Sequence, residues 1–545
     1  MKINYKFEKK LSKINFSYFF IFLIFSYFYL PHVFILNEDY NLASSLETDP
    51  GSLISSLSKL FEKPYYNMFK GYHLQYYGWT WASITFFAIL PFKILFSLFG
   101  INDDSYTIFL IRFIYFLIGL SSVFALFKIC NKFLEYKNTL LSFFVTNIYI
   151  FSPFYVFNLF YFIHPESTGI LFSFLGIICV LNFQYKSKII FFYLSIIFFA
   201  LAVFSKQAFI FSSLTLSIYL FFLVFKKDLA NKKFSLIVKS KILLLINSFF
   251  LVSFIFFLIH PYAFFFPYRF LASQISLGGS FKVNILTDVN YYSAINLWIK
   301  TYTSTFFFSI PFILSIFNPL IIHFSTKNLN DQILNLLTII CTIIVILLYS
   351  FINRANIQIY YFQVIVPISF IQILIFLKCI FQINLFKKNY FKFIILLLLI
   401  IYLLPEISGT LKRSQDRLSY KKTVNYKAYE WAKKNLNQSD RIAIDHRVAI
   451  PSKLNNITCH YWHHCNTYDK IVTFNPNYLA FTDPLPFWGW NKNEQGQNLK
   501  KYVKDNNFKI INIIEGDVTY NEGDVTYNGG YEWISDFKIL IYHKD

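Results

Sequence analysis

Two carboxylates, Glu38 and Asp39, stand together directly after the first apolar segment of the chain. A carboxylate can accept a proton from an incoming hydroxyl or amine as a general base. Lysine and arginine can hold a phosphate, arginine through a bidentate fork and lysine as a point charge. In the topology predicted below, further polar side chains return to the same membrane face, in His164-Pro165-Glu166, Lys206, Arg269, Arg354, Tyr360 and Tyr361. Carboxylates and cations at one face predict a site for a lipid phosphate, where the cations stabilise the charge on the departing phosphate.

Each of these residues also has a simpler structural interpretation. The acidic pair can be the solvated start of a loop, and Lys206 can be a lysine that extends from a helix end to the interface. Tyr360 and Tyr361 suit an aromatic belt at a membrane surface. Arg269 lies in a segment rich in Pro and Phe that can be an ordinary loop. At this point both interpretations stay open.

Long apolar segments must position these side chains. The 545 residues are 56% hydrophobic, 22% aromatic and only 14% charged, whereas soluble proteins average about 25% charged residues. Runs of about 20 apolar residues recur from Phe16 to Pro405, and each is long enough to cross a hydrocarbon core of roughly 30 Å. The net charge of +21 comes from short lysine clusters between these runs. This pattern favours membrane topology over nucleic-acid binding as the origin of the charge.

The lysine clusters also indicate how often the chain crosses. If 79–99 were a crossing, the later lysine clusters would lie outside, whereas a helix on the outer surface keeps them inside. We therefore predict about eleven crossings, from an inside N-terminus to an outside C-terminus, plus outer-surface helices. The predicted crossings are 14–36, 107–127, 138–160, 167–184, 189–204, 207–225, 243–260, 301–322, 333–351, 359–380 and 391–406.

From Ser408 onward the composition is that of a soluble domain. Hydrophobic spacing predicts a helix at 426–436 and strands at 441–444, 508–514 and 537–542. The fold predicted is mainly α: a transmembrane helical bundle over 1–406, with its first outer loop at 37–106, and a small extracytoplasmic α/β domain over 407–545. The seven residues EGDVTYN occur twice in tandem, at 515–521 and 522–528, which predicts an extended hairpin or loop.

Cys459 and Cys465 lie in this polar region and flank a histidine-rich stretch. They could pair as a disulfide if the domain is extracytoplasmic. Two thiols and three imidazoles are also zinc ligands, although the compact spacing fits no standard zinc finger. A disulfide, a metal site and neither of the two stay open. The chain contains no Gly-rich phosphate loop or Walker-type lysine, so a nucleotide-sugar donor or ATP coupling has no support.

This layout resembles the GT-C superfamily of membrane glycosyltransferases, which includes protein O-mannosyltransferases, lipid A aminoarabinose transferases and oligosaccharyltransferases. The similar features are the acidic pair followed by Tyr40, the Tyr77-Gly78-Trp79 stretch before an apolar surface helix, Arg112 at the start of the next span, and the small α/β tail. The resemblance covers the whole architecture, and its motifs are short and degenerate.

The resemblance implies transfer of a sugar, with inversion, from a polyprenyl-phosphate donor to a lipid, glycan or protein acceptor on the outer face of a bacterial inner (plasma) membrane. It places the base at Asp39 or Glu38, because families that write Asp-Glu-aromatic have the catalytic acid first, whereas this chain reads Glu-Asp-Tyr. It makes Glu166 a second acidic position that orients the acceptor or holds a divalent metal ion. A carboxylate in a first helical turn is also favoured without any function. The resemblance also implies contacts to the donor phosphate, made by Lys206, Arg354, Arg269 and Arg112. The contacts to the acceptor are made by His164, Tyr360 and Tyr361.

Three other functions stay open. A polysaccharide polymerase or ligase would use a lipid-diphosphate donor and favour an Arg-rich central loop, but 261–300 contains only Arg269. A membrane transporter is less favoured, because we find no hydropathy repeat between the two halves and the charged groups gather at one face. A non-catalytic membrane scaffold would tolerate removal of both Glu38 and Asp39 carboxylates.

Overall fold

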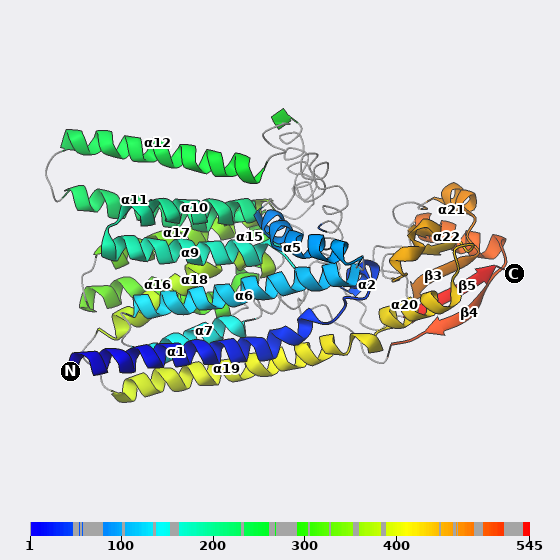
Figure 1. Cartoon of the computed structure of the whole chain (residues 1–545), viewed down its shortest axis with the longest axis horizontal. Helices are drawn as coiled ribbons and strands as arrows, with labels where there is room; N and C mark the ends of the chain where they lie inside the picture. Colours follow the sequence, from blue (N-terminus) through cyan, green and yellow to red (C-terminus); the bar gives the residue numbers. More distant parts are fainter. Residues whose placement is uncertain are drawn as a thin grey trace.

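The computed structural model describes residues 2–46, 54, 57, 80–100, 104–134, 138–152, 163–229, 234–260, 267–268, 291–303, 306–325, 329–352, 359–382, 389–445, 448–460, 465, 467–483, 494–516 and 538–544. Helices form a long bundle, and a small α/β domain lies beyond one end of it (Figure 1). We call this end of the bundle the domain end. The N-terminus lies at the opposite end, and the C-terminus lies at the far side of the α/β domain.

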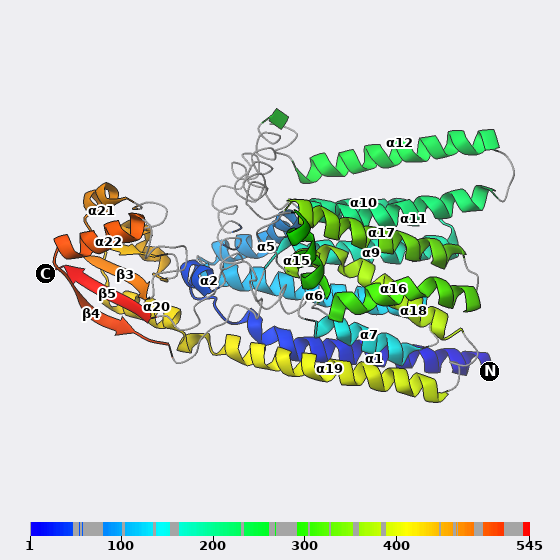
Figure 2. The same cartoon turned by 180° about the vertical axis from the view of Figure 1, so that it is seen from behind.

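The bundle consists of helices that run roughly along its long axis (Figures 1 and 2). They are α1 (Lys2–Tyr29), α6 (Asp104–Phe133), α7 (Thr139–Ile150), α9 (Pro165–Lys186), α10 (Ile189–Ser205), α11 (Ile210–Leu229), α12 (Phe234–Ile259), α16 (Phe306–Ser325), α17 (Leu329–Ile352), α18 (Val366–Ile380) and α19 (Asn389–Leu418). Among the described residues, nine helices of the chain are long and apolar enough to cross a membrane, and α7 and α10 are shorter apolar helices. The protein is a multi-pass membrane protein, which confirms the predicted fold class.

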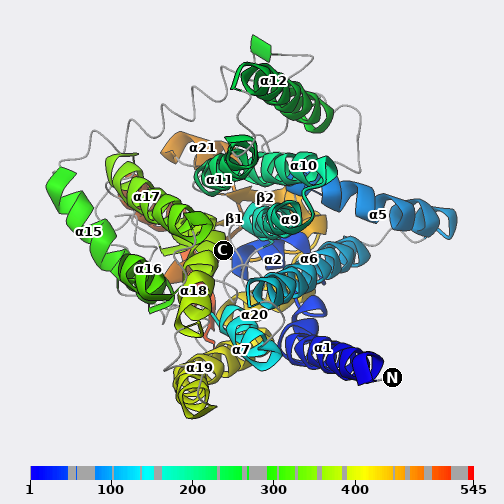
Figure 3. The same cartoon turned by 90° about the vertical axis from the view of Figure 1, so that its left-hand side faces the viewer.

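Several further elements gather near the domain end. Helix α5 (Thr80–Leu98) is long and apolar enough to cross, but it lies obliquely across the bundle (Figure 3), where the sequence predicts a surface helix. The predicted crossing 301–322 starts later than expected, because α15 (Tyr291–Thr303) is a separate helix ahead of α16. The other short elements are α2 (Tyr40–Leu46) and the 3-10 helices η1 (Leu30–Val33), η4 (Gln207–Phe209) and η5 (Ile359–Ile365).

Helix α9 is central to the packing, because it contacts α10 most extensively and also packs against α6. Two glycines of α9 allow this close approach. A Cβ atom at Gly169 would collide with the ring of Phe209, and one at Gly176 would collide with the ring of Phe199. The main apolar core surrounds these contacts and contains Phe174 and Ile177 of α9.

Helix α19 leads directly into the C-terminal domain. It continues to Leu418, so the predicted boundary between 406 and 407 falls inside this helix. The 3-10 helix η7 (Tyr420–Lys422) and helix α20 (Val424–Asn435) follow at once. Thr423 caps α20, since its side chain accepts a hydrogen bond from the backbone N–H of Tyr426.

The C-terminal domain contains a mixed five-stranded sheet in the order β2-β1-β3-β5-β4. Its strands are β1 (Ile442–Ile444), β2 (Thr458–His460), β3 (Tyr478–Asp483), β4 (Phe508–Ile514) and β5 (Lys538–Lys544). Strand β1 pairs in parallel with β2 and β3, whereas β5 runs antiparallel to β3 and β4. The predicted helix at 426–436 and the predicted strands at 441–444, 508–514 and 537–542 correspond to α20, β1, β4 and β5.

Helices cover both faces of this sheet. Helix α20 packs Val424, Ala428 and Ala432 against one face, together with Ile442 and Ile541. Helices α21 (Tyr468–Phe474) and α22 (Glu494–Asp505) belong to the core on the other face. Strands β2 and β3 and helices α21 and α22 were not predicted from the sequence. Residues 517–537, which hold most of the tandem repeat, lie outside the described residues.

Candidate functional site

The acidic pair lies where the first helix meets the C-terminal domain. Leu36 is fully buried and has a φ of 56°, a left-handed conformation that is uncommon for a leucine. It packs with Ile35 and Leu42 against Tyr420 and Tyr429 of the domain side. This turn redirects the chain after η1, so that the two carboxylates face the C-terminal domain.

Asp39 is buried and fully engaged by hydrogen bonds. The backbone N–H and the hydroxyl of Ser452 both donate to its Oδ2 at 2.8 Å, and the backbone N–H of Asn41 donates to its Oδ1 at 2.8 Å. Ser452 is the first residue of the 3-10 helix η8 (Ser452–Ile457). The carboxylate therefore lies at the N-terminus of a short helix, a favourable place for an anion.

Glu38 is exposed and has a different partner. The hydroxyl of Tyr420 donates a hydrogen bond to its Oε1. Burial, this hydrogen bond and the charge of Glu38 raise the pKa of Tyr420, so the phenol stays a donor. We call Glu38, Asp39, Tyr420 and Ser452 the junction cluster.

A second carboxylate lies inside the bundle, at the first turn of α9. Glu166 is only 1% exposed, and its two oxygens contact Nζ of Lys206 and Nδ1 of His164. Pro165 and Glu166 suit a first helical turn, where the fixed φ of proline and a negative charge are both favourable. We call His164, Glu166 and Lys206 the bundle cluster.

Glycine packing brings Lys206 to Glu166. Lys206 links the end of α10 to η4, and Phe209 at the end of η4 lies against Gly169, three residues after Glu166. A hydrogen in place of a side chain at Gly169 lets the two chain segments approach closely. The ammonium group of Lys206 then reaches the buried carboxylate.

His164 precedes α9 and is buried in this cluster. Its pKa is lowered well below the usual value, first by burial and then by the charge of Lys206. The Lys206 ammonium offsets the Glu166 carboxylate that would otherwise favour a charged imidazole. His164 is therefore neutral at pH 7, with Nδ1 placed to donate to Glu166.

Buried cations lie beside the junction. Nε2 of His32 is 2.9 Å from Oγ of Ser414, near the end of α19. The positive charges of Arg417 and Arg112 both act on His32. Arg112 and Arg417 are 6% and 1% exposed. Such burial is costly for a cation unless anions or polar groups compensate it. We call Arg112 and Arg417 the arginine pair.

The structure divides the predicted site residues between these groups. Glu38 and Asp39 lie in the junction cluster, His164, Glu166 and Lys206 in the bundle cluster, and Arg112 in the arginine pair. Lys206 binds a carboxylate, where the sequence analysis expected a phosphate contact. The structure does not place four further predicted residues in these groups: Arg269 and Arg354 lie outside the described residues, and so do the side chains of Tyr360 and Tyr361.

Three residues of this region were not predicted. They are Tyr420, Ser452 and Arg417. The first two lie in what the sequence presents as a separate domain, and Arg417 lies beyond the predicted end of the last crossing. One signal could have indicated Arg417. It lies three residues after Ser414, on a helix that continues past 406.

The described side chains do not form a metal site. Among them, no group of three or more His, Cys, Asp or Glu residues could hold a metal ion. Glu166, the expected metal ligand, already contacts the ammonium group of Lys206. Cys459 and Cys465 form a disulfide beside β2.

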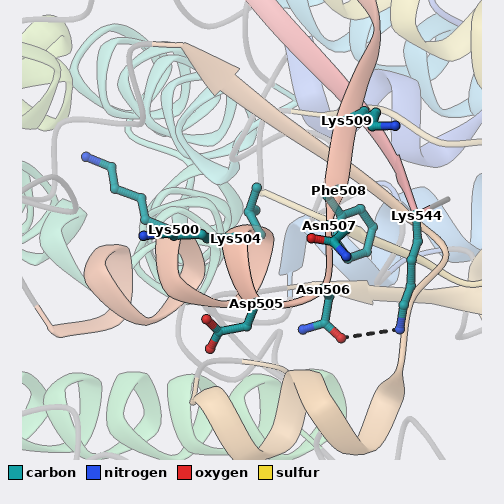
Figure 4. A pocket seen from close by; sticks show the side chains of 9 residues that line it. Lys500, Lys504, Asp505, Asn506, Asn507, Phe508, Lys509 and Lys544 are labelled. Carbon is teal, nitrogen blue, oxygen red and sulfur yellow. Dashed lines mark hydrogen bonds between the residues drawn. The ribbon is translucent and has the colours of Figure 1, made fainter.

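A cavity of about 730 Å³ lies on the C-terminal domain (Figure 4). Four lysines and Asp505 are among its lining residues, and Nζ of Lys544 is 3.3 Å from Oδ1 of Asn506. Lys544 ends β5, at the side of the domain far from the bundle (Figure 1). This position is remote from both carboxylate clusters, so we do not place the reaction there.

Comparisons with known proteins give a distant likeness in fold. No protein-family model matches the chain, and no curated protein matches it in sequence. The crystal structure of the oligosaccharyltransferase of Archaeoglobus fulgidus in complex with zinc and sulfate is similar, with a TM-score of 0.40 and 12% sequence identity. The similar part covers 85% of this chain and 67% of that chain. A likeness this distant assigns no family.

Proposed function

We propose that this protein is a membrane glycosyltransferase of the GT-C type, which transfers a sugar from a polyprenyl-phosphate donor to a lipid, glycan or protein acceptor. One observation carries the proposal: an exposed carboxylate, Glu38, is held by Tyr420 at the end of a membrane bundle where the C-terminal domain lies. The layout of the sequence, which resembles GT-C enzymes, supports the same function.

Glu38 is the better base of the acidic pair. Asp39 already accepts three hydrogen bonds and is 7% exposed, so an acceptor hydroxyl has little access to it. Glu38 is exposed, and Tyr420 occupies one of its two oxygens. Glu38 also holds the first acidic position of the motif. Asp39 then has a structural role at the N-terminus of η8.

The arginine pair is the better candidate for the donor phosphate. Lys206 neutralises Glu166 within the bundle cluster. The charges of Arg112 and Arg417 act on His32, six residues before Glu38 in the chain. A guanidinium group can bind phosphate oxygens through two parallel hydrogen bonds. Buried arginines at the end of a membrane bundle suit a phosphate whose polyprenyl chain remains in the lipid.

The reaction is a single displacement. The acceptor hydroxyl or amine loses its proton to Glu38 and forms a bond to the anomeric carbon. The bond from this carbon to the phosphate oxygen breaks, and the electron pair leaves with the polyprenyl phosphate. Attack from the face opposite the leaving phosphate inverts the anomeric configuration. The arginine pair stabilises the negative charge that develops on the phosphate.

We place this reaction at the outer face of the plasma membrane. The disulfide between Cys459 and Cys465 supports this side, because disulfides persist in oxidising compartments. The distribution of lysine clusters gives the same orientation under the positive-inside rule. The C-terminal domain then lies outside the membrane, next to the acceptor.

The test uses purified protein in lipid discs with a panel of labelled polyprenyl-phosphate sugars. We expect transfer or release of one sugar by the unaltered protein. Glu38→Gln removes the base and lowers the rate by about 10²- to 10⁴-fold, the usual contribution of general base catalysis. Glu430→Gln is the matched control, because Glu430 lies on α20 and forms a loose ion pair with Lys433 at 3.7 Å.

Three results would contradict the proposal or a part of it. Well-folded protein that neither binds nor turns over any polyprenyl-phosphate sugar is not such a transferase. Turnover of lipid-diphosphate donors alone would favour the polymerase or ligase function. Equal activity of Glu38→Gln and Glu430→Gln would remove Glu38 from the role of base.

A further inference from the structure

We propose that the C-terminal domain completes the catalytic site, because Tyr420 and Ser452 position the acidic pair and catalysis requires the docked domain. This inference rests on the proposed function and goes beyond it. It makes Tyr420 and Ser452 positioning residues, which act on the reaction through Glu38 and Asp39.

Three hydrogen-bonded contacts join the segment after η1 to one short stretch of the domain. Ser452 donates twice to Asp39. The side-chain amide of Asn41 donates to the backbone carbonyl of Ile450 at 2.8 Å and to Oδ1 of Asn455 at 2.7 Å. The partners are 409 to 414 residues apart in the chain, so these contacts exist only when the domain is docked.

The apolar contacts beneath these hydrogen bonds also exist only when the domain is docked. Leu36, Leu42, Tyr420, Tyr429 and Ala449 form one buried cluster that takes residues from both sides of the junction. Leu36 adopts its left-handed backbone conformation within this cluster. A strained residue persists where its surroundings hold it in place. The docked domain supplies that support directly before Glu38.

Tyr420 determines the geometry of the base. A glutamate side chain is flexible, and restricting it to one rotamer costs conformational entropy. The hydrogen bond from Tyr420 holds Glu38 in one orientation before the acceptor arrives. A displacement of about 1 Å in a catalytic group can lower the rate roughly 100-fold. Loss of this hydrogen bond therefore affects kcat, while the donor still binds at the arginines.

Point variants of the full chain in lipid discs test this role. Tyr420→Phe keeps the ring in the apolar cluster, and we expect kcat to fall about 10- to 100-fold, with KM for the donor unchanged. Ser452→Ala lowers kcat in the same way, and Ser452→Thr restores it, since threonine keeps both donors. Tyr468→Phe is the matched control, because Tyr468 makes the same type of bond, 2.8 Å to Asp505, on the exposed surface of the domain.

A reversible crosslink tests whether the docked state is the active one. Cysteines replace Asn41 and Asn455, and a short bis-methanethiosulfonate reagent joins them. The same double variant is assayed before crosslinking, after it and after reduction, with wild type in reductant as the control for the native disulfide. We expect the crosslinked protein to keep the activity of the uncrosslinked variant.

The outcomes separate this inference from the proposed function. Loss of activity on crosslinking, with recovery on reduction, would overturn the inference and make the contact inhibitory. Wild-type kcat in both Tyr420→Phe and Ser452→Ala would also overturn it, while the transferase function stood. A wild-type protein without turnover of any lipid-linked sugar would overturn both.

Discussion

The junction cluster and the bundle cluster both hold a carboxylate by hydrogen-bond donors, but they take their partners from very different distances along the chain. Glu166 is bound by Lys206, 40 residues away on a neighbouring segment. Glu38 and Asp39 are bound by residues 382 and 413 positions away, in another domain. The bundle cluster forms as the bundle folds, whereas the junction cluster also needs the domain to dock.

The carboxylates Glu166 and Glu38 also differ in how far they are buried. Glu166 is 1% exposed and faces a cation, which makes it a permanent part of the bundle. Glu38 is exposed and faces a neutral phenol. A buried ion pair is best suited to holding structure together, whereas an exposed carboxylate with one oxygen held can exchange protons. We therefore expect variants of the bundle cluster to change stability, and variants of the junction cluster to change activity.

The largest expected change in stability comes from breaking the buried ion pair. Glu166→Gln leaves the Lys206 ammonium without its counter-charge, and removing one partner of a buried pair typically costs about 3–5 kcal/mol. We expect a marked fall of the apparent melting temperature in lipid discs. The double variant Glu166→Gln with Lys206→Met should recover part of this loss. A melting temperature equal to that of wild type would show that Glu166 is not structural and would remove the contrast between the clusters.

A smaller loss of stability is expected from a substitution where α9 meets η4. Gly169→Ala places a methyl group against the ring of Phe209, and such overpacking typically costs about 1–3 kcal/mol. The strain should move Lys206 away from Glu166. Combining Gly169→Ala with Phe209→Leu makes room for the methyl group and should restore part of the melting temperature. If the single variant melts like wild type, close packing does not position the ion pair.

The smallest expected effect is a dependence of the stability on pH, which comes from His164 of the bundle cluster and from His260. Burial lowers the pKa of His164 in the folded protein, and burial lowers that of His260 to about 4. Unfolded histidines have a pKa of about 6.5, so the unfolded chain binds more protons below this value. The stability is therefore complete above pH 6.5 and falls as the pH drops below it, by up to about 1.4 kcal/mol per pH unit for each histidine.

Melting temperatures measured between pH 7.5 and 5.5 check this prediction. We expect a smaller slope for His164→Gln than for wild type, even if the variant starts from a lower melting temperature. His260→Gln should reduce the slope independently, since His260 lies at the end of α12 against Phe204 and Phe256. An unchanged slope in both variants would mean that neither histidine is kept neutral by the fold.

Much of the architecture follows from composition and periodicity. A chain with 56% hydrophobic residues in runs of membrane length must span a membrane. The β-branched content of 508–514 was enough to predict strand β4 with both ends correct. Strands β1 and β5 were recognised for the same local reason. The strand β2 was missed, because its residues Thr-Cys-His include none of the aliphatic residues that mark the equally short β1.

The candidate residues were identified by type and spacing, and their partners depended on the folded chain. A carboxylate after an apolar run is visible in the sequence at Glu38 and Asp39, and so is the acidic first turn at Glu166. No local pattern indicates that Ser452 would donate hydrogen bonds to Asp39, or that Tyr420 would donate one to Glu38. These pairs are separated by hundreds of residues, and docking of the C-terminal domain brings them together. Periodicity describes which face of a helix is buried, whereas contacts at this separation depend on how whole helices and domains pack.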